Sequence, residues 1–247
     1  MDKETHSGIY LLPNLLTTAS LFAAFYSMVS SMNGQYEAAV ISIFIGMIAD
    51  GLDGRIARLT NTQSEFGAQY DSLSDMVTFG VAPSLLLYQL SLNQLGKFGW
   101  LVAFMYTAAV ALRLARFNTQ IETADKRFFQ GLPCPPAAAV MASFAWLCFQ
   151  NDWQHYPFVV VLTAVLALSI AVLMVSNPRY YSFKEIDFKG KVPFLYVLVM
   201  IILFVAIAAN PTVVLFVGFS IYALSGPVFT LVSLRRRRKP REKASKR

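Results

Sequence analysis

Long apolar stretches, separated by short polar breaks, follow one another along almost the whole chain. Each stretch is long enough, as an α-helix that rises about 1.5 Å per residue, to cross the roughly 30 Å hydrocarbon core of a bilayer. Asparagine, glycine and proline occupy the breaks, as at Asn33-Gly34 and Asn177-Pro178, and these residues commonly end helices. The pattern therefore predicts an all-α integral membrane bundle of about eight transmembrane helices, at residues 10–32, 36–58, 66–92, 97–118, 134–150, 156–176, 191–209 and 211–233. Because only Asn210-Pro211 separates the last two stretches, seven spans are the alternative.

Basic residues divide unequally between the two sides of this predicted bundle. Lys and Arg accumulate in the cytoplasmic loops of membrane proteins. With eight helices, Lys97 is the one basic residue on one side, and the other twenty of the 21 lie on the opposite side. A wrong helix count would mix the two sets. The distribution thus predicts eight spans in the cell membrane, with both termini in the cytoplasm.

The composition agrees with a membrane protein. Apolar residues make up 56% of the chain and charged residues 14%, which lies outside the usual range of soluble proteins. Much of the net charge of +7 comes from the tail, which we interpret as an anchor against anionic headgroups and not as a nucleic-acid-binding segment. We expect a single transmembrane domain, residues 1–234, and a basic cytoplasmic tail, residues 235–247. Cys134 and Cys148 lie in or beside apolar stretches without metal-ligand spacing, and we expect both to be structural.

Four aspartates lie within the predicted membrane helices, where a single carboxylate costs about 2.5 to 3.5 kcal/mol. Asp50 and Asp53 are near the end of the second helix, and Asp71 and Asp75 share one face of the third because they are four residues apart. A polar link joins the two helices, and Ser64 is the expected N-cap of the third. The two helices should be antiparallel neighbours, so the two pairs of carboxylates should converge near the cytoplasmic headgroups.

Converging carboxylates repel one another, and two divalent cations would balance four negative charges. Oxygen ligands favour Mg²⁺ or Mn²⁺, and paired ions suit phosphoryl chemistry because they hold phosphate oxygens and the leaving group. On the same helix face, the small residues Gly54 and Ala57 allow a ligand or another helix to approach the backbone closely. Spacing alone leaves two alternatives open, which are proton or sodium transport and a salt-bridged pair of structural helices.

The segment from Asp50 to Asp75 reads DGLDGRIARLTNTQSEFGAQYDSLSD and has the pattern D-x-x-D-G-x-x-A-R, eight residues, then G-x-x-x-D-x-x-x-D. It resembles, without departure, the signature of the CDP-alcohol phosphatidyltransferase family. The resemblance implies an enzyme that moves a phosphatidyl group from a CDP-activated lipid to a small alcohol. It implies that Asp50, Asp53, Asp71 and Asp75 bind the metal ions, and that Asp75 is also the general base for the incoming hydroxyl.

The same resemblance implies that four further motif residues shape or contact the CDP group. These residues are Gly54, Ala57, Arg58 and Gly67. The resemblance covers roughly the first 140 residues, and the motif-bearing catalytic part is expected at about 10–176. The C-terminal helices, at about 191–233, carry little recognisable signal, and we expect them to pack the bundle or to form contacts in a homodimer.

Segments outside the motif resemble the phosphatidylserine synthase branch of the family, and they are PNLLT at 13–17, MVTFGVAPS directly after the motif, ALRLARFN at 111–118 and FQGLPCPPAAA at 129–139. This implies CDP-diacylglycerol as donor and L-serine as acceptor, with glycerol 3-phosphate or inositol as alternative acceptors. The carboxylate of serine needs a cation, and Arg113 and Arg116 share a helix face because they are three residues apart. Cytoplasmic anchoring is the alternative role of both arginines. Asn118 is a further candidate for a polar contact with the acceptor.

Overall fold

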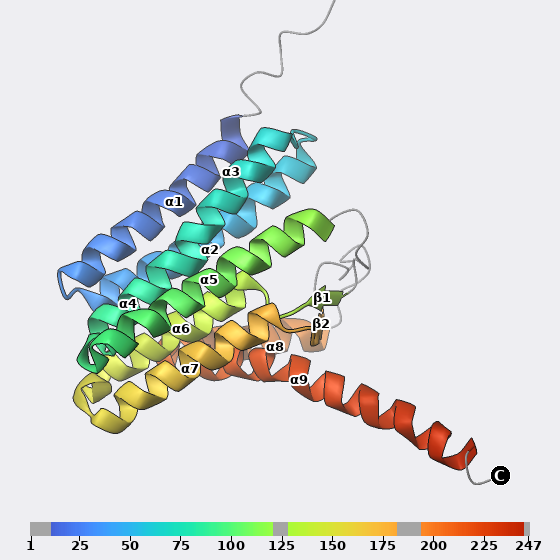
Figure 1. Cartoon of the computed structure of the whole chain (residues 1–247). Coiled ribbons are helices and arrows are strands. Elements are labelled where there is room, and N and C mark those ends of the chain that lie inside the picture. Colours follow the sequence, from blue (N-terminus) through green and yellow to red (C-terminus); the bar gives the residue numbers. More distant parts are fainter. Residues whose placement is uncertain (1–10, 121–127, 182–193, 245–247) are drawn as a thin grey trace, which may run out of the picture.

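The computed structural model describes residues 11–120, 128–181 and 194–244, and within these ranges the chain is almost entirely helical. Its α-helices are α1 (Leu11–Met32), α2 (Tyr36–Leu59), α3 (Glu65–Asp75), α4 (Ala82–Leu90), α5 (Lys97–Gln120), α6 (Cys134–Gln150), α7 (Pro157–Val175), α8 (Phe194–Ala209) and α9 (Pro211–Ala244). The described strands, β1 (Phe128–Gln130) and β2 (Arg179–Tyr181), form a small antiparallel ribbon. Most helices lie side by side in a bundle, and the end of α9 projects away from it (Figure 1).

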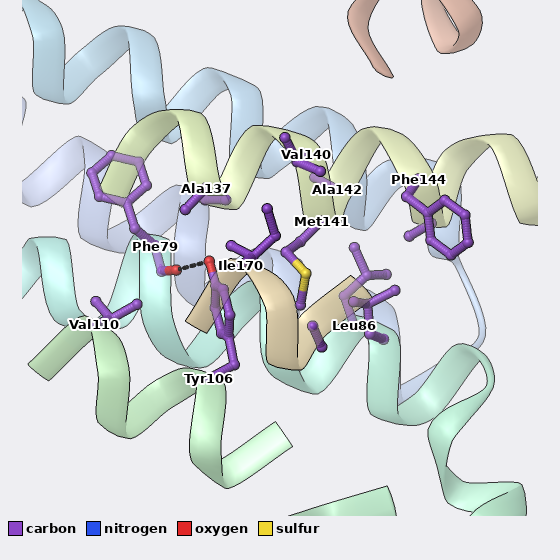
Figure 2. Close-up of a cluster of buried hydrophobic side chains, with 14 of the residues drawn as sticks. Phe79, Leu86, Tyr106, Val110, Ala137, Val140, Met141, Ala142, Phe144 and Ile170 are labelled. Atoms are coloured by element: carbon purple, nitrogen blue, oxygen red, sulfur yellow. Dashed lines mark hydrogen bonds between the residues drawn. The ribbon is translucent and has the colours of Figure 1, made fainter. Parts of the chain in front are cut away.

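Helix α6 lies inside the bundle and carries much of the core. It packs against α2, α4 and α9, and alanines make up much of its buried surface, so neighbouring backbones can approach closely. Figure 2 shows Met141 of this helix in one cluster with Leu86 of α4, Tyr106 of α5 and Ile170 of α7. The helix begins directly after Pro133, and two more prolines in its first turn fix the backbone there.

The predicted third helix, 66–92, is continuous in space but changes its winding. Residues Met76–Val81 form a π-helical segment between α3 and α4. Such segments leave backbone groups without their usual helical partners, and here Tyr106 donates its hydroxyl to Phe79 O at 2.9 Å (Figure 2). On the opposite side, the hydroxyls of Ser20 and Thr78 lie 3.2 Å apart. The π segment begins directly after Asp75, so it is held by α1 and α5 at the point where the acidic motif ends.

Arg116 caps the end of α7 and fixes the ribbon beside it. Its Nη1 donates to Val175 O and to Asn177 Oδ1, both at 3.0 Å, and its Nη2 donates to Gln130 O at 3.0 Å. The last carbonyls of a helix lack partners within that helix, and the guanidinium supplies them. Gly131 leaves room for this group: it has φ +77°, and a Cβ there would lie 2.3 Å from Met174 O and 2.9 Å from Arg116 Nη2.

Tyr180 connects the ribbon to α9. Its ring is completely buried, and its hydroxyl donates to Ala223 O at 2.8 Å. Burial raises the pKa of Tyr180, so the phenol remains a hydrogen-bond donor at neutral pH. A Cβ at Gly226 would lie only 2.3 Å from the ring, so glycine is required for this contact. The C-terminal helix is thus anchored to the same ribbon that Arg116 fixes.

Most of the predicted helices agree with the structure to within three residues, and Ser64 is confirmed as the N-cap of α3. The expected start of the seventh helix at 191 lies outside the described residues, and α9 continues past 233 to Ala244. Four described helices are long and apolar enough to cross a membrane, over Leu12–Met32, Lys97–Thr119, Pro157–Val175 and Pro211–Thr230. Two shorter apolar helices cover Cys134–Gln150 and Val197–Ala209. The helical class is confirmed and four of the described helices are candidate membrane spans, whereas the number of crossings and the position of the termini stay predictions.

Candidate metal and nucleotide site

The acidic motif is built at one end of the helices α1, α2 and α3. The Ser64 side chain accepts a hydrogen bond from Gly67 N at 3.0 Å and so begins α3. Helix α1 is tied to α3 by Ser74, which donates its hydroxyl to Thr17 O at 3.2 Å, and by the hydroxyls of Thr18 and Tyr70, which lie 2.9 Å apart. The three helices therefore hold their polar faces in a fixed arrangement.

Three of the four motif carboxylates converge. Asp50, Asp53 and Asp71 each offer one oxygen atom, and these atoms lie within 4.8 Å of one another. Asp53 is almost fully buried, and Thr17 donates a hydrogen bond to its Oδ2 at 2.7 Å. The spacing-based prediction that residues from two neighbouring helices would meet thus agrees with this geometry.

The donor set fits a hard divalent cation. The Oδ1 atoms of Asp71 and Asp75 are buried and have no hydrogen-bond partner within the described residues. Buried polar atoms are nearly always paired in folded proteins, so unpaired carboxylate oxygens beside other carboxylates indicate that a cation belongs there. Oxygen-only ligands suit Mg²⁺ or Mn²⁺ better than they suit zinc. The acidic cluster can therefore hold a divalent metal ion.

Asp75 lies beside this cluster. It lies within electrostatic reach of Asp50, while its oxygens are not among the three that lie within 4.8 Å of one another. Asp75 is the last residue of α3, directly before the π segment, and it lies within electrostatic reach of Asp50 of α2 and Cys134 of α6. A carboxylate in this place can accept a proton from a group that approaches from the interior. Its roles as a metal ligand and as a base stay predictions.

A pocket of about 210 Å³ opens beside the cluster, and it brings together residues that the motif keeps apart in sequence. All four residues expected to contact CDP line it, and they are Gly54, Ala57, Arg58 and Gly67. Asp53 and Asp71 form part of the same lining, so a phosphate in the pocket would lie next to the metal-binding oxygens. Gly54 and Ala57 have small side chains and leave open space on the α2 side of this pocket. A Cβ at Gly54 would meet only Arg58, at 3.7 Å.

Sequence reasoning did not assign a role to several polar residues of this pocket. Asn14 and Thr17 come from α1, and Thr62 and Gln63 come from the link between α2 and α3. Asn14 Oδ1 would be 3.4 Å from a Cβ at Gly67, which places the amide at the pocket wall. The sequence signal for Asn14 and Thr17 is their polarity, because an Asn and a Thr stand out within the apolar stretch that forms α1.

The predicted acceptor residues all lie on α5, but each of them contacts a different part of the structure. Arg113 is 8% exposed, and its Nη1 donates to Cys134 Sγ at 3.2 Å. Arg116 faces the end of α7, where its two terminal nitrogens are engaged with backbone carbonyls and Asn177. Asn118 Nδ2 donates to Ser72 Oγ at 3.0 Å, next to Asp71. None of the three acceptor roles is tested by these contacts, but Arg116 has a structural function that the sequence did not indicate.

Comparison with known proteins agrees with this geometry. The family model for CDP-alcohol phosphatidyltransferase matches residues 10–175, which include α1 to α7. The chain is 39% identical to the CDP-diacylglycerol–serine O-phosphatidyltransferase of Helicobacter pylori over 222 residues, which cover 88% of this chain and 90% of the relative.

Two further relatives are less similar in sequence. The protein of the same name from Bacillus subtilis is 34% identical over 175 residues, or 70% of this chain and 92% of that protein. The archaetidylserine synthase of Methanothermobacter thermautotrophicus is 33% identical over 181 residues, or 72% of each chain. All three names include serine, while the third differs in the lipid.

Proposed function

Because the chain belongs to the CDP-alcohol phosphatidyltransferase family, we propose that it transfers the phosphatidyl group of CDP-diacylglycerol to the hydroxyl of L-serine, which gives phosphatidylserine and CMP. The observation that carries this proposal is the 39% identity to a serine O-phosphatidyltransferase over 90% of that protein's length. The acidic cluster and the pocket beside it supply the chemistry that such a transfer needs.

The donor lipid binds in the pocket at the ends of α1, α2 and α3. Its nucleotide part lies along Gly54, Ala57 and Gly67, where small side chains admit a bulky ligand, and Arg58 pairs with a phosphate. Asp50, Asp53, Asp71 and Asp75 would hold two divalent ions, either Mg²⁺ or Mn²⁺. When bound, these ions neutralise the pyrophosphate and stabilise the leaving CMP.

The acceptor approaches from the side of Asp75. The serine hydroxyl gives its proton to this carboxylate, and its oxygen forms a bond to the phosphorus that carries diacylglycerol. The bond between that phosphorus and the bridging oxygen breaks, and CMP leaves with the electron pair. Arg113, which is buried on α5, binds the serine carboxylate. Asn118 is held at the edge of the acceptor site by its hydrogen bond to Ser72. Arg116 supports the acceptor site indirectly, because it fixes the end of α7.

The membrane placement belongs to the same proposal. Eight crossings, with α3, the π segment and α4 counted as one, put both termini and the acidic cluster on the cytoplasmic side of the cell membrane. The ends of α2 and α5 and the ribbon lie at one end of the bundle (Figure 1), which agrees with a shared cytoplasmic face. Residues 1–234 form one transmembrane domain, the tail from 235 is cytoplasmic, and the protein works as a homodimer.

An acceptor assay tests the function directly. Purified protein in mixed micelles receives CDP-diacylglycerol, Mg²⁺ or Mn²⁺, and one of L-serine, glycerol 3-phosphate or inositol, and CMP release and the lipid product are measured. We expect phosphatidylserine with serine alone and no product after chelation of the metal. A product with glycerol 3-phosphate or inositol, and none with serine, would reject the choice of acceptor while keeping the reaction class.

A further inference from the structure

Cys134 lies buried at the start of α6, in contact with Arg113. It is the first residue of α6 and is 1% exposed, and its sulfur accepts a hydrogen bond from Arg113 Nη1 at 3.2 Å. Pro133 before it and Pro135 after it fix the backbone on both sides, so the position of the sulfur is determined by the start of the helix. Arg113 reaches it from α5, and the contact therefore links two helices inside the bundle.

The Nε donor of Arg113 indicates a ligand. Arg113 is more than nine-tenths buried, and its Nε is a buried nitrogen without a hydrogen-bond partner within the described part of the chain. A buried charged donor that is left unpaired is costly, and a carboxylate is the group that pairs best with a guanidinium. The arginine is thus held at one nitrogen and open to an anionic partner at another.

Cys134 lies between Arg113 and the motif carboxylates. Cys134 lies within electrostatic reach of Asp50 and of Asp75, as well as of Arg113. In serine only three covalent bonds separate the hydroxyl oxygen from the carboxylate carbon. Groups that contact both ends of so small an acceptor must lie on neighbouring elements. Cys134 of α6 accepts a hydrogen bond from Arg113 of α5 and lies within electrostatic reach of Asp75 of α3, so it connects the three elements.

We infer that Cys134 is a positioning residue for the acceptor: its sulfur holds Arg113 Nη1 so that Nε faces the carboxylate of a small amino-acid substrate beside Asp75. This inference rests on the proposed serine transfer. It gives Cys134 a role other than the structural one expected from its apolar surroundings. A buried sulfur is a weak acceptor, so it fixes the direction of the guanidinium while leaving the charge available to the substrate.

Substitutions at Cys134 separate this role from simple packing. Alanine and serine both remove the large sulfur atom, but only serine retains a hydrogen-bond acceptor. Cys148 provides the matched control, because it lies on the same helix and is likewise 1% exposed. The assay measures KM for serine at saturating CDP-diacylglycerol, KM for the lipid at saturating serine, and kcat, with thermal unfolding in detergent as the check on folding.

Cys134→Ala should raise KM for serine about five- to tenfold, which corresponds to one lost hydrogen bond, with KM for the lipid and kcat within about twofold of wild type. Cys134→Ser should recover most of this loss, and Cys148→Ala should leave both constants unchanged. If the alanine variant does not fold, Cys134→Val removes the acceptor with an apolar side chain of similar size.

Two results would overturn the inference in an enzyme that makes phosphatidylserine. One is an unchanged KM for serine in a folded Cys134→Ala or Cys134→Val variant. The other is a rise of KM for L-serine and of KM for the lipid by the same factor in Cys134→Ser and in Cys134→Ala, because such a rise would reflect packing alone. Absence of phosphatidylserine formation by the wild-type protein would instead reject the proposed function, so the two failures are distinguishable.

Discussion

Substitution of Gly54 tests the nucleotide site without disturbing the packing of the protein. A Cβ built at Gly54 would meet only Arg58 Nη1, at 3.7 Å, which is an ordinary contact. Alanine also favours a helix over glycine by about 0.8–1.0 kcal/mol. Gly54→Ala should therefore fold at least as stably as the wild type. Any loss of activity then reports on a ligand that needs the space above the glycine.

The expected loss follows from the position of Gly54 in the pocket. The residue lines the cavity next to Asp53, and a methyl group there would hold a phosphate or ribose away from the metal-binding oxygens. A displacement of about 1 Å can cost about a hundredfold in rate. We expect kcat/KM for CDP-diacylglycerol to fall by about ten- to a hundredfold, or roughly 1.4 to 2.7 kcal/mol of transition-state stabilisation.

Gly51 is the matched control for this experiment. It lies on the same helix, a Cβ there would meet nothing within 4 Å, and it is not part of the pocket lining. Both alanine variants should show equal or higher thermal stability, and Gly51→Ala should retain wild-type kinetics. The reasoning is refuted if Gly54→Ala turns over like the wild type, or if Gly51→Ala loses activity to the same extent.

Three further substitutions test other parts of the structure. Asp71→Asn should lower activity roughly a hundredfold or more, because loss of a metal ligand should cost at least as much as loss of the contacts that support a ligand. CMP release over a series of Mn²⁺ concentrations measures this effect. Activity equal to wild type at low Mn²⁺ would contradict the metal site. Gly226→Ala should lower the unfolding temperature, because its methyl would overlap the Tyr180 ring at a cost of about 1–3 kcal/mol, while Gly218→Ala, which meets nothing within 4 Å, should not. Arg116→Ala should lower the unfolding temperature by leaving the α7 carbonyls unpaired, and a selective rise of KM for serine without loss of stability would return this arginine to the acceptor site.

Local rules were sufficient for most of the fold. The apolar stretches set the helices, and Asn-Gly and Asn-Pro set the breaks, so α1, α2 and α6 were placed nearly to the residue. The acidic cluster followed from helix periodicity together with one short link, because residues on the facing sides of two antiparallel neighbours must meet. These features depend only on contacts within or between adjacent elements.

Features that depend on distant contacts were not predictable. The π segment is stabilised by Tyr106, which donates to Phe79 O from a helix that begins sixteen residues after the segment ends. The periodicity of 66–92 is that of an ordinary helix, so the change in winding is invisible in sequence. Likewise, spacing put Arg113 and Arg116 on one face, but three residues correspond to about 300° of rotation, and the remaining 60° directs one toward Cys134 and the other toward α7.

The division between these two arginines suggests how an apolar bundle holds a reaction between charged partners. Arg116 uses its terminal nitrogens to close the end of α7 and the ribbon, and Tyr180 extends the same support to α9. Arg113 stays within the bundle, and its Nε has no hydrogen-bond partner among the residues that the structure describes. Arg113 and Arg116 lie on the same helix, so the contacts that tie α5 to the end of α7 also hold the backbone that carries Arg113. An unpaired buried donor is stable only where the surrounding structure determines its place, and that support is what the ribbon and the end of α7 provide.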